Sequence, residues 1–254
     1  MKVALIQAPL VWEDKRKNIE YFDSILNHLE NDVDLVVLPE MFTSGFTMRP
    51  ESVYSTMEGE EAGWMKTMAK KHSFALTASM IVKDGEDFFN RMFFVFPDGG
   101  FKTYDKRHLF SLAGEEKVYK AGVERLIVSY KGWNICPLVC YDLRFPVFSR
   151  NFNAAYDLLI YVASWPNQRI YAWDTIIKAR AIENMSYVVG VNRCGVDENE
   201  NMYSGHSQVV DYLGGYIVEP MIGECVSYVV LDKEKQDMSR SRFGFLKDAD
   251  QFSL

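Results

Sequence analysis

Short apolar runs recur along the whole chain, and each has the length and composition of a β-strand. They are rich in branched and aromatic residues, which are enriched in strands. Turn signals bound several of them, at Pro97 to Gly100, Lys131-Gly132 and Gly214-Gly215. The pattern predicts strands over residues 3–7, 35–38, 75–82, 91–96, 101–105, 126–130, 134–139, 158–163, 187–192, 208–212, 216–219 and 225–231. A chain with so many strands must fold around large sheets.

Helical patterns separate some of these runs. Apolar residues recur with the spacing of one helix face over residues 19–29 and 176–181, and a third helix is predicted over residues 59–72. Hairpin-like pairs of runs are mixed with strand–helix–strand units. This mixture predicts the α/β class, with large sheets of mixed direction covered by helices. No linker, low-complexity stretch or internal repeat divides the chain, so residues 1–254 are expected to form a single domain.

Length, composition and charge exclude several classes of protein. Of the 254 residues, 48% are hydrophobic, yet no stretch approaches the roughly 20 apolar residues of a membrane span. The first apolar run, Val3 to Gln7, is short and is soon followed by Glu13-Asp14, which predicts a first strand and no signal peptide. The formal net charge is -7, without a dense Lys or Arg cluster. We therefore expect neither nucleic acid nor a membrane as a partner.

The cysteines indicate the redox state. Cys136, Cys140, Cys194 and Cys225 form no C-x-x-C pair and show no zinc-site spacing. Cys136 and Cys140 are four residues apart on one predicted strand, so they face the same side but cannot easily bridge. This usage is typical of a reduced, cytoplasmic protein.

Three predicted strands end in residues that can carry chemistry. The strand over 134–139 ends directly before Cys140, and a sharp turn and a helix-like segment follow. A nucleophile needs this placement, because a strand holds the backbone rigid while the junction exposes the side chain. The runs over 35–38 and 101–105 end near Glu40 and at Lys106. These three residues are a candidate base, cation and nucleophile.

At these positions the chain resembles a known family. The blocks LPEMF (38–42), YDKRHLF (104–110) and VCYDLRFP (139–146) are similar, in order and spacing, to the three signature blocks of the carbon–nitrogen hydrolase (nitrilase) superfamily. Residues 18–19, 179–184 and 205–207 also fit, so the resemblance covers nearly the whole chain. Within the superfamily the chain is most similar to the bacterial omega-amidase branch, through residues 42–46, 140–146 and 247–250.

The resemblance implies a fold, an activity and an assembly. The fold is a four-layer αββα sandwich of two mixed sheets flanked by helices, and two copies are expected to form a homodimer through the helical face beside the nucleophile. No metal and no cofactor are implied. The expected substrate is a small-molecule amide, because omega-amidases hydrolyse the terminal amide of dicarboxylic acid monoamides such as 2-oxoglutaramate, 2-oxosuccinamate and succinamate.

The chemistry of the three residues agrees with an amidase. A carboxylate base and a nearby cation can deprotonate a thiol, so Glu40 would take the proton of Cys140. Lys106 and the backbone N–H of Tyr141 would stabilise the tetrahedral oxyanion. The family also has a second glutamate in the loop after the lysine. Spacing to Ala121-Gly122 favours Glu115 as this second glutamate, with its neighbour Glu116 as the alternative.

Other residues are expected to shape the substrate pocket. The guanidinium of Arg144, four residues after the nucleophile, would bind the substrate carboxylate through two hydrogen bonds. A structural role for Arg144, paired with Asp142 or a helix end, stays open. The aromatic residues predicted to wall the pocket are Phe42, Phe46 and Trp165.

Three alternative functions remain. An N-carbamoyl amidase or a true nitrilase would use the same three residues on another substrate. A catalytically silent scaffold on this fold would need none of them, so the intact set of Glu40, Lys106 and Cys140 disfavours it.

Overall fold

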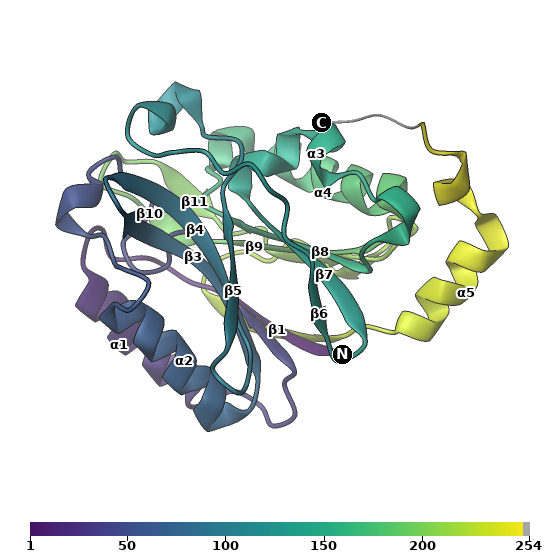
Figure 1. The fold of residues 1–254 in the computed structure, drawn as a ribbon, viewed down its shortest axis with the longest axis horizontal. Coiled ribbons are helices and arrows are strands. Elements are labelled where there is room, and N and C mark those ends of the chain that lie inside the picture. Colours follow the sequence, from purple (N-terminus) through teal and green to yellow (C-terminus); the bar gives the residue numbers. More distant parts are fainter. Residues whose placement is uncertain (251–254) are drawn as a thin grey trace.

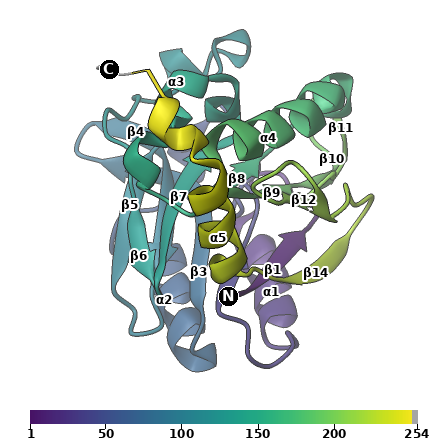
Figure 2. The same cartoon turned by 90° about the vertical axis from the view of Figure 1, so that its right-hand side faces the viewer.

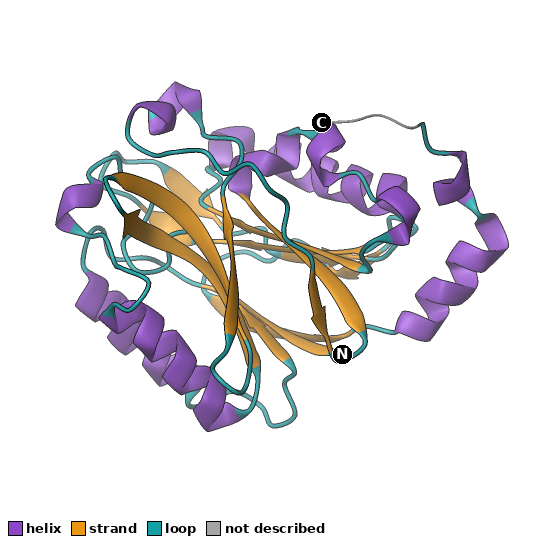
Figure 3. Ribbon diagram, viewed as in Figure 1, coloured by secondary structure: helices purple, strands orange, loops and turns teal. Residues whose placement is uncertain are grey.

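Two six-stranded sheets stack face to face with helices on their outer faces (Figures 1 and 3). The computed structural model describes residues 1–250, so residues 251–254 of the predicted domain lie outside it. The first sheet has the order β14 (Cys225–Val230), β1 (Lys2–Gln7), β2 (Leu35–Val37), β3 (Ala75–Asp84), β4 (Asp87–Val95), β5 (Phe101–Asp105). The second has the order β13 (Tyr216–Val218), β12 (Gln208–Val210), β9 (Tyr187–Asn192), β8 (Leu158–Ala163), β7 (Trp133–Val139), β6 (Val128–Tyr130).

The helices form the outer two layers. Helices α1 (Lys15–Leu26) and α2 (Glu60–His72) cover the first sheet, and α3 (Pro146–Ser149) and α4 (Ile170–Asn184) cover the second (Figure 1). Helix α5 (Lys233–Phe243) crosses the starting ends of β8 and β9 (Figure 2), where Gln236 donates to the carbonyls of Asp157 and Met185. Short 3-10 turns cover Pro50–Ser52, Ser111–Ala113, Glu115–Lys117, Cys140–Arg144, Phe152–Ala154, Asn167–Arg169 and Phe245–Asp248.

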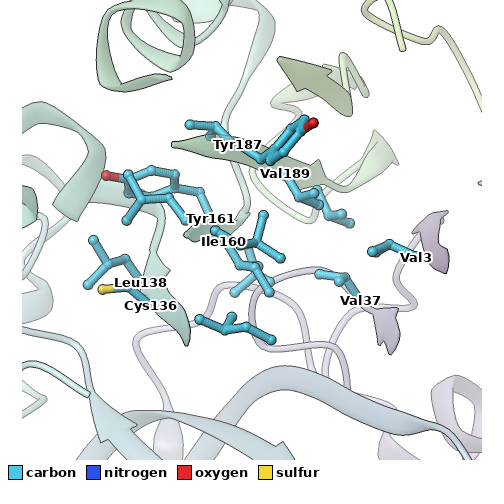
Figure 4. Packing of buried hydrophobic residues seen from close by; sticks show 14 of the residues in the cluster. Val3, Val37, Cys136, Leu138, Ile160, Tyr161, Tyr187 and Val189 are labelled. Carbon is cyan, nitrogen blue, oxygen red and sulfur yellow. The ribbon is translucent and has the colours of Figure 1, made fainter. Parts of the chain in front are cut away.

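Alternation along β1 places its side chains in two separate apolar layers. In β1, Val3 and Leu5 face the second sheet, while Ala4 and Ile6 face the helices α1 and α2. This is the period of two that a strand imposes on its side chains. Figure 4 shows Val3 and Val37 of the first sheet on one side of the inner core, with Ile160 of the second sheet across from them. Strands of both sheets are therefore covered on both faces, which explains their continuous apolar runs.

Strand direction decides where the site forms. Strands β1, β2 and β3 are parallel, and β5 runs in the same direction as β3 because two antiparallel pairings separate them. In the other sheet β7, β8 and β9 are parallel. The carboxyl ends of β2 and β5 therefore lie at the same end of the first sheet. Those of β7 and β8 lie at the same end of the second. Residues that follow these strands can meet between the two sheets.

The predicted fold class is confirmed: the chain is an α/β sandwich of two mixed sheets flanked by helices. Each predicted run contains a strand, and the helices predicted over 19–29, 59–72 and 176–181 correspond to α1, α2 and α4. Two features were not predicted. These are the hairpin of β10 (Cys194–Val196) and β11 (Met202–Ser204), and helix α5. No helix within residues 1–250 is long and apolar enough to cross a membrane.

Candidate active site

Cys140 lies at a strained junction directly after β7. Its φ is 44°, in the left-handed region that costs a non-glycine residue energy, so the surrounding structure must hold it there. The carboxylate of Asp142 does so, accepting from the Val139 N–H at 3.0 Å and from the Tyr104 hydroxyl at 2.7 Å. Asp142 also accepts from the backbone N–H of His108 at 3.0 Å. Asp142 and His108 therefore organise the turn that presents the thiol.

Glu40 lies beyond the end of β2 and is fully buried. One carboxylate oxygen accepts from Lys106 Nζ at 3.0 Å and from Asn90 Nδ2 at 2.9 Å. The other accepts from the backbone N–H of Ser164 at 2.8 Å. Glu40 is also close enough to Cys140 for its carboxylate to act on the pKa of the thiol. Because all of these partners are fixed, the carboxylate is oriented toward the nucleophile without room to rotate.

Lys106, directly after β5, is held between two carboxylates. Its ammonium group donates to Glu115 at 2.8 and 3.0 Å and to Glu40 at 3.0 Å. Burial would lower the pKa of Lys106, but the charges of Glu115 and Glu40 outweigh it and raise that pKa above its ordinary value. Lys106 is therefore charged over the working range of pH. Of the two glutamates in this loop, Glu115 is the buried one, whereas Glu116 is exposed.

The thiol itself is neutral at rest. Burial raises the pKa of Cys140 well above its ordinary value, and the negative charge of Glu40 raises it further, against the opposing charge of Lys106. Since a thiolate is the attacking form, the proton must leave as the substrate is attacked. The neighbouring Glu40 carboxylate is the acceptor in place for that transfer.

The nucleophile opens into a cavity of about 580 Å³. The predicted site residues Cys140, Tyr141, Arg144, Phe46 and Trp165 all line it. The other residues on its wall are Trp12, Thr47, Met48, Arg49, Phe110, Leu112, Ala113, Ser164, Pro166, Arg169, Asp197, Glu198, Asn199, Asn201 and Tyr203. The charged residues Glu40, Lys106 and Glu115 are buried behind this wall. Cys140 lines the cavity and lies between it and these charged groups.

The prediction that Phe42 lines the pocket is wrong. Phe42 is fully buried on the opposite side of the first sheet, where its ring packs against Phe22 and Trp64 at 5.6 and 5.7 Å between centroids. It belongs to the core beneath α1 and α2 and does not line the cavity. The aromatic residue at the cavity wall is Phe46, four residues later, whose ring lies 5.2 Å from Lys106 Nζ.

The structure adds residues that the sequence did not single out. Asn90, fully buried on β4, donates to both Glu40 and Glu115, and nothing in its sequence context marks it. Ser164 follows β8 directly, so the strand-end rule that found Glu40 could have found it. Its buried hydroxyl has no hydrogen-bond partner in the described structure and lies at the cavity. Arg169, in a 3-10 turn, also lines the cavity and had no sequence signal.

Comparison with known proteins gives the family. The profile of the family described as carbon-nitrogen hydrolase matches residues 2–236. The chain belongs to the carbon-nitrogen hydrolase family. It is therefore a hydrolase of carbon–nitrogen bonds, as the three sequence blocks predicted. Among residues 1–250, no group of three or more His, Cys, Asp or Glu side chains could hold a metal ion.

Relatives within the family match most or all of the chain. Omega-amidase YafV of Yersinia enterocolitica is 42% identical, over 100% of this chain and 98% of that protein. The 2-oxoglutaramate amidase of Bacillus subtilis is 30% identical, over 85% of each. The crystal structure of a CN-hydrolase superfamily protein from Xanthomonas campestris, with an arsenic adduct in its active site, is 42% identical with a TM-score of 0.98, covering 100% of this chain and 98% of that one.

Proposed function

We propose that this protein is an omega-amidase, which hydrolyses the terminal amide of a short dicarboxylic acid monoamide to the acid and ammonia. One observation carries the proposal. The cavity at Cys140 also contains the guanidinium of Arg144, which makes no ion pair in the described part of the chain. A substrate with an amide at one end and a carboxylate at the other needs such a nucleophile and such a cation in one short cavity. The omega-amidase and 2-oxoglutaramate amidase relatives support this substrate class.

The first half of the reaction forms an acyl-enzyme. Cys140 Sγ attacks the amide carbon as Glu40 takes the thiol proton. Charge develops on the amide oxygen, where Lys106 and the Tyr141 N–H stabilise it. Glu40 then gives its proton to the amide nitrogen, the C–N bond breaks, and ammonia leaves. A thioester between Cys140 and the substrate acyl group remains.

The second half releases the acid. Water enters the position left by ammonia, and Glu40 removes one of its protons as the oxygen attacks the thioester. The C–S bond breaks, the acid forms, and Cys140 recovers its proton from Glu40. The sum is amide plus water to acid plus ammonia, and no other reactant is needed. Glu115 and Asn90 keep Lys106 and Glu40 in place throughout.

Arg144 would hold the free carboxylate of the substrate. Its guanidinium stacks over the ring of Trp165, 4.9 Å from the centroid, which fixes a planar pair of donors toward the cavity. Arg144→Ala should lower kcat/KM for succinamate, by a factor that corresponds to about 2–5 kcal/mol of transition-state stabilisation. It should affect a neutral amide of similar length much less. Arg144→Lys should recover part of the loss. Equal losses on the two amides would make Arg144 structural.

The experiment that tests the function is ammonia release across a panel of substrates. The panel contains ω-monoamides of dicarboxylic acids, N-carbamoyl compounds and nitriles. We expect the highest kcat/KM for the ω-monoamides. Carbon dioxide release from carbamoyl compounds at a higher kcat/KM would make the protein a carbamoyl amidase, and preferential turnover of nitriles would make it a nitrilase. No turnover of any class by protein with an alkylatable Cys140 would favour a silent scaffold.

We also propose a homodimer formed through the outer face of α3 and α4. Large apolar side chains are exposed there, including Val147 (46%), Tyr171 (82%) and Ile182 (54%). Exposed apolar residues gathered on one face favour contact with another protein surface. Sedimentation of the purified protein would test the dimer.

A cytoplasmic location is proposed as well. The described cysteines are all free thiols, which is typical of a reducing compartment. Cell fractionation would test this location.

A further inference from the structure

Three arginines line the cavity, but they are not equivalent. Arg49 is committed to Glu13, whose carboxylate it contacts at 2.9 and 3.0 Å. Arg144 and Arg169 make no side-chain hydrogen bond or ion pair within residues 1–250. Two acids also line the cavity. Asp197 accepts hydrogen bonds within its own loop, Glu198 is exposed, and neither forms an ion pair with Arg144 or Arg169 within residues 1–250. Two guanidinium groups that form no ion pair within residues 1–250 therefore face one cavity.

Aromatic rings hold both free guanidinium groups in place. Arg144 lies 4.9 Å from the ring centroid of Trp165, and Arg169 lies 5.1 Å from that of Phe110. Trp165 also donates from Nε1 to the carbonyl of Arg169 at 2.8 Å, so one tryptophan orients one arginine and fixes the backbone of the other. Phe110 in turn packs edge-on against Tyr141, the residue after the nucleophile, at 5.0 Å. Stacked guanidinium groups lose less rotational freedom when they bind a ligand.

The presence of two free guanidinium groups indicates which acceptor groups the ligand carries. Two like charges in one cavity repel each other, and an anionic ligand relieves that repulsion. A single carboxylate is satisfied by one planar guanidinium, which would leave the second without an acceptor. A 2-oxo acid carries a carboxylate and an adjacent keto oxygen, and together these accept hydrogen bonds from two guanidinium groups.

We propose that Arg169 is a specificity-determining residue that recognises, together with Arg144, the 2-oxo acid end of the substrate. This inference rests on the proposed omega-amidase function and narrows it to monoamides of 2-oxo dicarboxylic acids. Arg144 holds the carboxylate and Arg169 donates to the keto oxygen. Monoamides of equal length without the keto group bind to the same cavity but leave Arg169 without a partner.

Two substrates that differ only in the keto group test the proposal. We would measure kcat/KM for 2-oxoglutaramate and for glutaramate with the wild-type protein, Arg169→Gln and Arg169→Lys. Loss of the guanidinium in Arg169→Gln should reduce kcat/KM for 2-oxoglutaramate about 10-fold more than for glutaramate, the factor that one hydrogen bond to a charged group supplies. Arg169→Lys should restore part of this difference. In Arg49→Gln, which removes a cation already paired with Glu13, the ratio between the two substrates should stay at its wild-type value.

A binding measurement keeps the test independent of turnover. In a Cys140→Ala background, 2-oxoglutarate should bind more tightly than glutarate, and Arg169→Gln should abolish that difference. Equal losses on both substrates, or an oxo preference that survives Arg169→Gln in a protein with native circular dichroism, would overturn the inference and leave the omega-amidase function intact. If the wild-type protein hydrolyses neither amide, the proposed function fails first, and this inference fails with it.

Discussion

At the scale of single residues, two buried carboxylates behind the nucleophile share one lysine. Lys106 is the one cation in contact with Glu40 and Glu115 among the described residues, and all three side chains are buried. Burial raises the pKa of Glu115, and Lys106 opposes that shift. The lysine is therefore held firmly, and the thiol beside it stays protonated until attack. This arrangement makes Glu40 a base and Glu115 a residue that positions Lys106.

Glu115→Gln tests that division of roles. Removing the charge of Glu115 should lower the pKa of Lys106, so the fall of kcat on the alkaline side should move to lower pH. We expect kcat near neutral pH to drop about 10²- to 10³-fold, as when a preorganised charge in an active site is disturbed. The adjacent Glu116 is exposed, so Glu116→Gln is the matched control and should retain wild-type kcat. A Glu115→Gln protein with an unchanged pH profile would contradict this role.

At the scale of elements, strand ends were the informative positions. Glu40, Lys106 and Cys140 could be predicted because each comes after the end of a predicted strand, and the topology brings those strand ends together. The sequence cannot show which face of a sheet a side chain takes after the strand has ended. Phe42 was misplaced for this reason, since the turn after Glu40 directs it into the core beneath α1 and α2.

The elements missed by sequence analysis lack an apolar pattern. Helix α5 is polar on nearly every face and buries only Gln236, so no periodic stripe marks it. The β10–β11 hairpin exposes Val196 and Met202, and the carboxylate of Asp197 holds its tip through the N–H of Asn201 and the hydroxyl of Tyr203. Side-chain hydrogen bonds of this kind are not visible as periodicity.

Asp34 lies directly before β2, and its contacts connect the two sheets. A substitution at this position tests how much these contacts stabilise the fold. Its carboxylate accepts from the backbone N–H of Lys2 at 2.7 Å and pairs with Lys131 of the other sheet. Burial alone would raise the pKa of Asp34, but these two contacts lower it below 3.8. Since the folded-state pKa is depressed, the stabilisation is present above pH 3.8 and is lost as pH falls through the folded-state value.

Asp34→Asn should therefore lower the free energy of unfolding by about 1–2 kcal/mol at pH 7. The difference from the wild-type protein should shrink as the pH is lowered toward 3. Urea unfolding at several pH values measures it, and Asp32→Asn, an exposed neighbour in the same loop, is the control. A deficit that stays constant down to acid pH would mean that the ionised carboxylate is not what stabilises this edge.

At the scale of the whole molecule, the end of the chain carries apolar surface outward. Phe243 and Phe245 stack at 5.2 Å between centroids, yet they remain 40% and 55% exposed. Exposed aromatic rings side by side favour contact with another protein surface, and we expect that surface to belong to the second copy in the proposed dimer.

Removal of the residues after Arg242 should therefore weaken the proposed dimer or lower the melting temperature. The double substitution Phe243→Ser with Phe245→Ser is the sharper test, because it keeps the chain length and removes only the apolar surface. Sedimentation over a range of concentrations would report the dimer and calorimetry the melting temperature. An unchanged association and an unchanged Tm in both variants would remove the tail from the interface.

The proposed function depends on a thioester between Cys140 and the acyl group of an ω-monoamide. The most direct measurement is mass spectrometry of a reaction with succinamate stopped by acid within the first turnover. We expect a succinyl mass increase on the peptide that contains Cys140. Hydroxylamine should divert the acyl group to a hydroxamate, and the adduct should be absent in Cys140→Ala. Cys136→Ala, which changes a buried core thiol on the same strand, should still form it. Ammonia release with no adduct on Cys140 and no hydroxamate would contradict the thioester mechanism.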